Sequence, residues 1–88
     1  DENGPVKVSD PECKWLLVKH KNKILVLLCT WNPEPSTVTL DFDVQKLDMS
    51  ITKAREIENK TNLTVKDNQV KVKLKGYGWK FVQLHNDL

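Results

Sequence analysis

The stretch from Ile24 to Asp43, ILVLLCTWNPEPSTVTLDFD, constrains the fold more than any other part of the chain. Its first part, Ile24–Trp31, is apolar on both faces over several residues, as expected of a strand covered on two sides at the centre of a sandwich. A turn containing Pro33 and Pro35 follows, because proline has no N–H for a sheet ladder. The second part, Thr37–Phe42, alternates between apolar and polar residues. The stretch therefore predicts a buried central strand followed by a strand with one face in water.

Further strand signals run through the rest of the chain. Lys14–His20 is also apolar on both faces, so we expect it to pair with Ile24–Trp31 around a Lys21–Lys23 turn and form the buried middle of the fold. Asp43–Met49 begins with an acidic helix-cap candidate and predicts a single helical turn. The other extended segments are Lys53–Glu58, Leu63–Val65, Gln69–Lys75 and Trp79–Leu84. Because short turns join most of them, the predicted fold is all-β: a small antiparallel β-sandwich of six to seven strands with at most one short helical turn.

Length and composition limit the class of protein. A chain of 88 residues builds one small core, so residues 1–88 are expected to form a single domain. The longest apolar runs, Trp15–Val18 and Ile24–Cys29, are far shorter than the roughly 18–20 residues that span a bilayer, so we expect no membrane insertion. Arg55 is the single arginine among 14 basic residues. Since arginine is the side chain that binds guanine and phosphate bidentately, we expect no nucleic-acid partner.

The two cysteines, Cys13 and Cys29, leave two interpretations open. If the predicted hairpin forms, Cys13 lies almost opposite Thr30 and the two sulfurs come near one another, as a disulfide requires. The interpretation that we favour instead makes Cys29 a small core residue and Cys13 a free surface thiol. His20 and His85 have no partner at metal-ligand spacing, so the sequence predicts no metal site and no cofactor.

Four aromatic residues divide into two groups. Trp15 and Trp79 alternate in phase with apolar neighbours, which predicts that they belong to the core. Trp31, beside the Asn-Pro turn, and Tyr77, at a hairpin tip, are expected to be partly exposed. A flat aromatic face can stack on a sugar ring, so Trp31 and Tyr77 are the candidate ligand-binding residues.

Two further features concern modification and catalysis. Asn59 and Asn62 each begin an N-glycosylation sequon and are candidate glycan sites in a secreted eukaryotic protein. The chain has no G-x-S-x-G motif and no glycine-rich phosphate loop. We therefore expect no catalytic residue and no enzymatic activity of the chain by itself.

Two segments, ILVLLCTWNPEPSTVTLDFDVQKLDM and VKVKLKGYGWKFVQL, resemble the small C-terminal β-sandwich that follows the catalytic domain in many glycoside hydrolases and related uncharacterised proteins. The resemblance lies in Trp31–Pro35, Thr37–Leu40, Lys46–Met49, Val70–Leu74 and Tyr77–Leu84. It implies a non-catalytic accessory domain at the C-terminal end of a longer carbohydrate-active protein. Its partner would be the catalytic domain of the same chain, which it packs against and stabilises. The resemblance also implies an extracellular or periplasmic location, about which the sequence itself says nothing.

Two other functions are compatible with the same fold, because fold alone does not choose among them. One is a carbohydrate-binding module that uses Trp31 or Tyr77, and the other is an immunoglobulin-like adhesion or interaction module. A sugar binder needs an exposed pair of roughly coplanar aromatic rings. A docking domain should instead show an apolar surface patch without a cleft.

Overall fold

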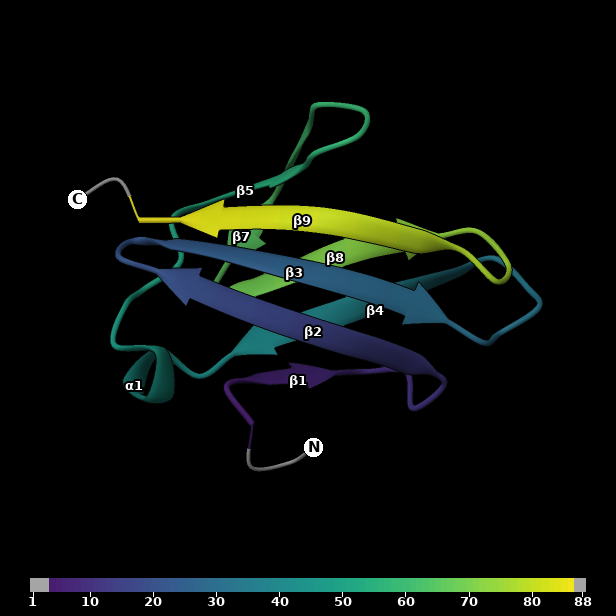
Figure 1. Ribbon diagram of the computed structural model, residues 1–88, viewed down its shortest axis with the longest axis horizontal. Helices are drawn as coiled ribbons and strands as arrows, with labels where there is room; N and C mark the ends of the chain where they lie inside the picture. The colour runs from purple at the N-terminus through teal and green to yellow at the C-terminus, as the bar shows by residue number, and fades with distance from the viewer. Residues whose placement is uncertain (1–3, 87–88) are drawn as a thin grey trace.

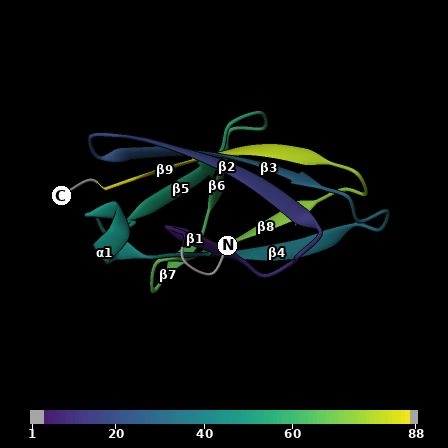
Figure 2. The ribbon, with the colours of Figure 1, turned by 60° about the horizontal axis from the view of Figure 1, so that its bottom comes forward.

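The computed structural model describes residues 4–86, which fold into two antiparallel sheets packed face to face. One sheet has four strands in the order β1-β4-β8-β7, and the other has five in the order β2-β3-β9-β5-β6. Figure 1 looks down on the five-stranded sheet, and Figure 2 shows the two layers from the side. In chain order the elements are β1 (Val6–Val8), β2 (Cys13–His20), β3 (Lys23–Thr30), β4 (Ser36–Phe42), α1 (Val44–Leu47), β5 (Lys53–Glu56), β6 (Thr61–Leu63), β7 (Val65–Lys66), β8 (Gln69–Leu74) and β9 (Trp79–His85). The predicted all-β sandwich with one short helical turn is confirmed.

The number of strands is larger than predicted, because residues 4–86 contain nine strands rather than six or seven. The N-terminal strand β1 was not predicted: its three residues are too few to display a two-residue period. The predicted extended segment Leu63–Val65 belongs to two strands, β6 and β7, which lie in different sheets. The chain therefore crosses from one layer to the other at Thr64.

The core fills the space between the sheets and follows the two-residue period of the strands. In β3, β4, β8 and β9 the side chains that point inward are almost completely buried: Ile24, Val26, Leu28, Val38, Leu40, Phe42, Val70, Val72, Leu74, Val82 and Leu84. Burial of one such aliphatic side chain contributes about 1.5–3 kcal/mol. The inward faces predicted for Thr37–Phe42 and Gln69–Lys75 are therefore confirmed.

The position predicted for the pair Lys14–His20 and Ile24–Trp31 is wrong. Strand β2 is the edge of the five-stranded sheet, and β3 is the next strand in. The β4–β8 layer covers only one face of this pair, while outward residues such as Leu16 remain exposed. The prediction failed because apolar residues on both faces of a strand are typical of a strand covered by two layers. Within residues 4–86, only one layer, the four-stranded sheet, covers β2 and β3.

The helical turn α1 lies where the sequence predicted it. The Asp43 carboxylate accepts hydrogen bonds from the backbone N–H groups of Gln45 and Lys46, at 3.0 and 3.1 Å. Asp48 ends the helix in the left-handed region, with φ 54°. Leu47 turns into the core and so ties the helix to the sandwich.

Candidate interaction face

The two outer faces of the sandwich differ in chemistry. On the four-stranded sheet, the side chains of β4 and β8 that point away from the core are Thr37, Thr39, Asp41, Gln69, Lys71 and Lys73. All are polar or charged, as expected of a face in contact with water.

The outer face of the five-stranded sheet is largely apolar. We call the following residues the outer apolar face: Leu16, Val18, Leu25, Leu27, Ile57, Trp79 and Phe81. The exposed fractions of Leu16, Val18 and Trp79 are 63%, 57% and 53%. The core of this sandwich does not bury the large apolar side chains at these positions, so they add little hydrophobic stabilisation to the domain by itself.

The strand register makes this face continuous. Leu16, Leu27 and Phe81 lie opposite one another in one row across β2, β3 and β9. Val18 and Leu25 are paired two residues further along the same strands. Side chains at directly opposed positions have Cβ atoms about 4.5–5.5 Å apart, so these rows form one patch. Contiguous apolar patches on a protein surface are typical of interaction sites.

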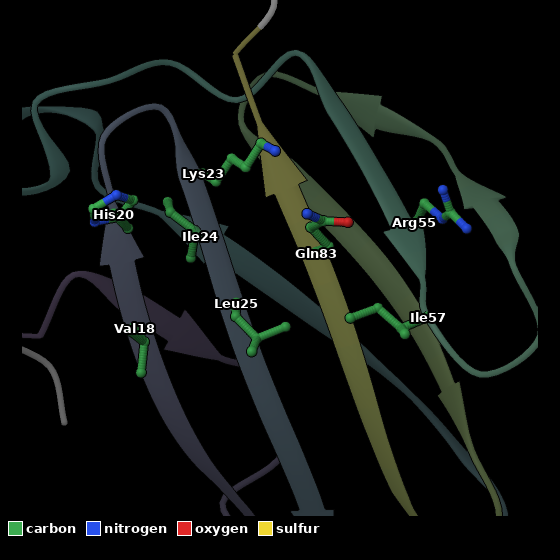
Figure 3. Close-up of a pocket in the computed structure, with 8 residues that line it drawn as sticks. All are labelled: Val18, His20, Lys23, Ile24, Leu25, Arg55, Ile57 and Gln83. Atoms are coloured by element: carbon green, nitrogen blue, oxygen red, sulfur yellow. The ribbon is translucent and has the colours of Figure 1, made fainter.

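An open depression of about 490 Å³ lies at one end of this face, close to the β2–β3 turn. Its lining residues are Val18, His20, Lys23, Ile24, Leu25, Arg55, Ile57 and Gln83. Figure 3 shows that they come from neighbouring strands of one sheet, with the side chains of Leu25 and Ile57 directed toward each other across β9. The lining contains aliphatic and basic groups and no carboxylate.

The two aromatic residues predicted to be exposed lie on adjoining loops at the other end of the sheet. The exposed fractions of Trp31 and Tyr77 are 65% and 66%. The Tyr77 N–H donates to the Asn32 carbonyl at 2.9 Å, and the Thr30 N–H donates to the Gly78 carbonyl at 3.0 Å. The exposure expected for both side chains is therefore confirmed, while binding of a ligand by them stays a prediction.

Tyr77 shares an open hollow of about 410 Å³ with Trp79. The prediction that Trp79 belongs to the core is wrong, because β9 directs Val82 and Leu84 inward and Trp79 outward. Both phases of this strand contain apolar residues, so its period alone does not choose the inner face. Trp15 does pack against the core, as predicted.

The cysteines have the reverse of the favoured arrangement. Cys13 lies opposite Thr30, as predicted, but Thr30 faces the core and Cys13 is buried beside it. Cys29 is one residue earlier in β3 and therefore faces outward, where it is exposed. Both are free thiols. Burial raises the pKa of the Cys13 thiol, and the Asp10 carboxylate raises it further.

The two sequon asparagines have different surroundings. The Asn59 amide donates to Glu56 Oε1 at 2.7 Å, while the other Glu56 oxygen accepts from Lys80 Nζ at 2.8 Å. Asn62 lies in the edge strand β6 and is exposed. Glycosylation of either residue stays a prediction.

Residues 4–86 bear on two further kinds of site, a metal centre and a membrane-spanning helix. Among them, no three His, Cys, Asp or Glu side chains are grouped so that they could hold a metal ion. Over the same range, no helix has the length and apolar character needed to cross a bilayer.

These features define a class: a small antiparallel sandwich with one polar and one apolar outer face. The model of the glycoside hydrolase 123 C-terminal domain matches residues 1–82, and the chain belongs to this family of domains. The predicted resemblance to glycoside hydrolase C-terminal sandwiches is therefore confirmed.

A solved structure shares the fold. It is a GH27 β-L-arabinopyranosidase from Geobacillus stearothermophilus, in complex with arabinose, with a TM-score of 0.67 and 17% sequence identity. The similarity covers 90% of this chain and 18% of that chain, so this chain spans less than a fifth of that enzyme. No curated protein matches the chain.

Proposed function

We propose that this chain is a non-catalytic accessory β-sandwich that packs against the catalytic domain of a longer carbohydrate-active protein and stabilises it. Residues 1–88 are then one domain, the C-terminal module of that parent chain. Two observations support the proposal: membership of a glycoside hydrolase C-terminal family and the outer apolar face. The family suggests which domain is the partner, and the face suggests where the partner packs.

The contrast between the two outer faces carries the proposal. The four-stranded sheet shows that this sequence can make a fully polar outer face with threonine and lysine. The five-stranded sheet has leucine, valine, phenylalanine and tryptophan at many of its outward positions, with basic residues gathered toward one end. Covering this apolar surface is favourable by about 25 cal/mol per Å². Domain interfaces within one chain bury about 600–1,500 Å², which one face of a small sandwich can provide.

The test uses the full-length parent protein with two substitutions, Leu16→Ser and Val18→Ser. Both side chains are mostly exposed, so the sandwich itself should keep its stability. We expect the thermal midpoint of the catalytic domain to fall by about 2–4 °C per kcal/mol of lost docking energy. The matched control, Lys71→Ser with Lys73→Ser on the polar outer face, should leave that midpoint unchanged. Equal midpoints for both double variants would contradict the proposal.

A second candidate function, carbohydrate binding, is favoured by the hollow that Tyr77 and Trp79 share. Glu58 and Asn59 also line it, so aromatic rings and polar groups for sugar hydroxyls are adjacent. Titration with plant-cell-wall and bacterial oligosaccharides should then shift tryptophan fluorescence, and Tyr77→Ala should abolish the shift. An unchanged spectrum over the whole panel would remove this candidate.

A further inference from the structure

We infer that the depression near the β2–β3 turn receives an apolar side chain of the parent's catalytic domain, and that carboxylates flank this side chain on the partner surface. The inference rests on the proposed function, because it gives the chemistry of the surface that the outer apolar face would meet. It concerns one end of that face, lined by Val18, Leu25 and Ile57 with basic groups around them.

The depression is a hollow in an otherwise continuous apolar surface. Its volume of about 490 Å³ is bounded by aliphatic groups of β2, β3 and the residue after β5, with Gln83 of β9 between them (Figure 3). Well-packed interfaces have the density of protein interiors and leave few voids larger than a water molecule. A flat partner surface would leave this hollow empty under the apolar face. A projecting aromatic or branched aliphatic side chain would fill it.

Basic side chains lie around the depression. One row across the sheet consists of basic residues in four neighbouring strands: His20, Lys23, His85 and Lys53. Arg55 lies in the next row, opposite Gln83. The outward ladder positions of β2, β3, β9 and β5 hold no Asp or Glu. The whole chain is nearly balanced, with 12 acidic and 14 basic residues, whereas the charged residues at these outward positions are all basic.

Within residues 4–86, the two acidic side chains that follow Arg55 most closely in the sequence, Glu56 and Glu58, are turned to other partners. Glu56 points inward and binds Lys80 and Asn59. Glu58 accepts a hydrogen bond from the Phe81 N–H at 3.1 Å. Carboxylates from a partner would therefore complement Lys23 and Arg55 at the depression, and a guanidinium such as that of Arg55 pairs with a carboxylate through two parallel hydrogen bonds.

The same charges argue against a second copy of this chain as the partner. A two-fold contact centred on the depression would place the same residues of both copies close to one another. The basic row would then lie near its own equivalent, and like charges across an interface are unfavourable. An acidic surface of a different domain has no such penalty.

The test uses the full-length parent with Lys23→Glu and Arg55→Glu. The exposed thiol of Cys29 lies on the same face, opposite Trp79 on one side and Lys14 on the other, and reports whether the face is covered. We expect the double variant to raise the alkylation rate of Cys29 by about tenfold, equal to about 1.4 kcal/mol of lost docking. The matched control, Lys71→Glu with Lys73→Glu, makes the same change in net charge on the polar face and should leave the rate unchanged.

Two further variants separate the outcomes. Arg55→Lys keeps the charge and should keep most of the protection of Cys29. If the charge reversal behaves like its control while Leu16→Ser with Val18→Ser exposes Cys29, the inferred carboxylates are absent and the docking proposal stands. If neither double variant exposes Cys29, the docking proposal itself fails.

Folding and an alternative partner are checked in the same samples. The buried Cys13 should react slowly in every variant, and fast labelling of Cys13 would show that the sandwich has unfolded. In that case the milder double variant Lys23→Gln with Arg55→Gln replaces the charge reversal. It should raise the alkylation rate of Cys29 by a smaller factor. Co-sedimentation of the full-length protein with vesicles containing phosphatidylglycerol, together with unprotected Cys29 in their absence, would assign the face to an anionic membrane and overturn the inference.

Discussion

At Gly76 two loops approach so closely that no side chain fits between them. A Cβ atom there would lie 2.0 Å from the Pro33 carbonyl oxygen, which is a backbone atom that cannot rotate away. The next residue, Tyr77, has a φ of 54° and donates its N–H to Asn32. The sequence showed a glycine-containing turn here but not its neighbour, because the contact joins residues more than 40 positions apart in the chain.

The substitution Gly76→Ala tests this contact. We expect it to lower the free energy of unfolding by about 1–3 kcal/mol, since one of the two loops must move to admit the methyl group. Glu34→Ala, an exposed position in the facing loop, is the control and should change it by less than about 0.5 kcal/mol. Urea denaturation of both variants gives the comparison, and equal midpoints would show that the loops are not in close contact.

Cys13 gives a prediction about pH. Because the folded state raises the pKa of this thiol, the unfolded chain loses the proton first as the pH rises. The contribution to stability is complete below the thiol's unfolded pKa, about 8.5, and decreases as the pH rises through the folded value. We expect wild type to lose more stability than Cys13→Ala between neutral pH and about pH 10. Parallel slopes for the two proteins would mean that Cys13 has an ordinary pKa.

At the level of elements, the sequence predicted strands well where one face alone is apolar. Thr37–Phe42 of β4 and the whole of β8 alternate without exception, so their inner and outer faces could be assigned from the residues. In β3 and β9 both phases contain apolar residues, and burial then depends on which sheet lies on which side. The side on which the second sheet packs is a property of the tertiary structure and cannot be read from the strand alone. For this reason Cys29 and Trp79 were predicted to be in the core although both face outward. The same ambiguity hid the outer apolar face, whose residues were interpreted as core.

The helical turn α1 depends on one side chain. Asp43 satisfies two backbone N–H groups at the helix start, so Asp43→Ala should destabilise the protein by about 0.5–2 kcal/mol. Asp43→Asn keeps a side-chain acceptor and should cost clearly less. Thermal unfolding followed by far-ultraviolet circular dichroism measures both, and equal losses would show that the cap bond contributes little.

At the scale of the whole molecule, the two outer faces of the sandwich differ in polarity. The four-stranded sheet is polar outside, whereas the five-stranded sheet carries leucine, valine, phenylalanine and tryptophan there. The chain belongs to a family of glycoside hydrolase C-terminal domains, and such domains are parts of longer chains. Another domain of the same chain is therefore the partner that we propose for the outer apolar face. The sequence predicted the fold class and the family, but recognising the outer apolar face required the register of the strands.

The most direct test of this account is the alkylation rate of Cys29 in two proteins, the full-length parent and the separate 88-residue domain, followed peptide by peptide with mass spectrometry. Cys13 is the internal control and should react slowly in both. We predict that Cys29 reacts readily in the separate domain and at least about tenfold more slowly in the parent, where the catalytic domain covers the outer apolar face. Equal rates for Cys29 in the two proteins would contradict the account.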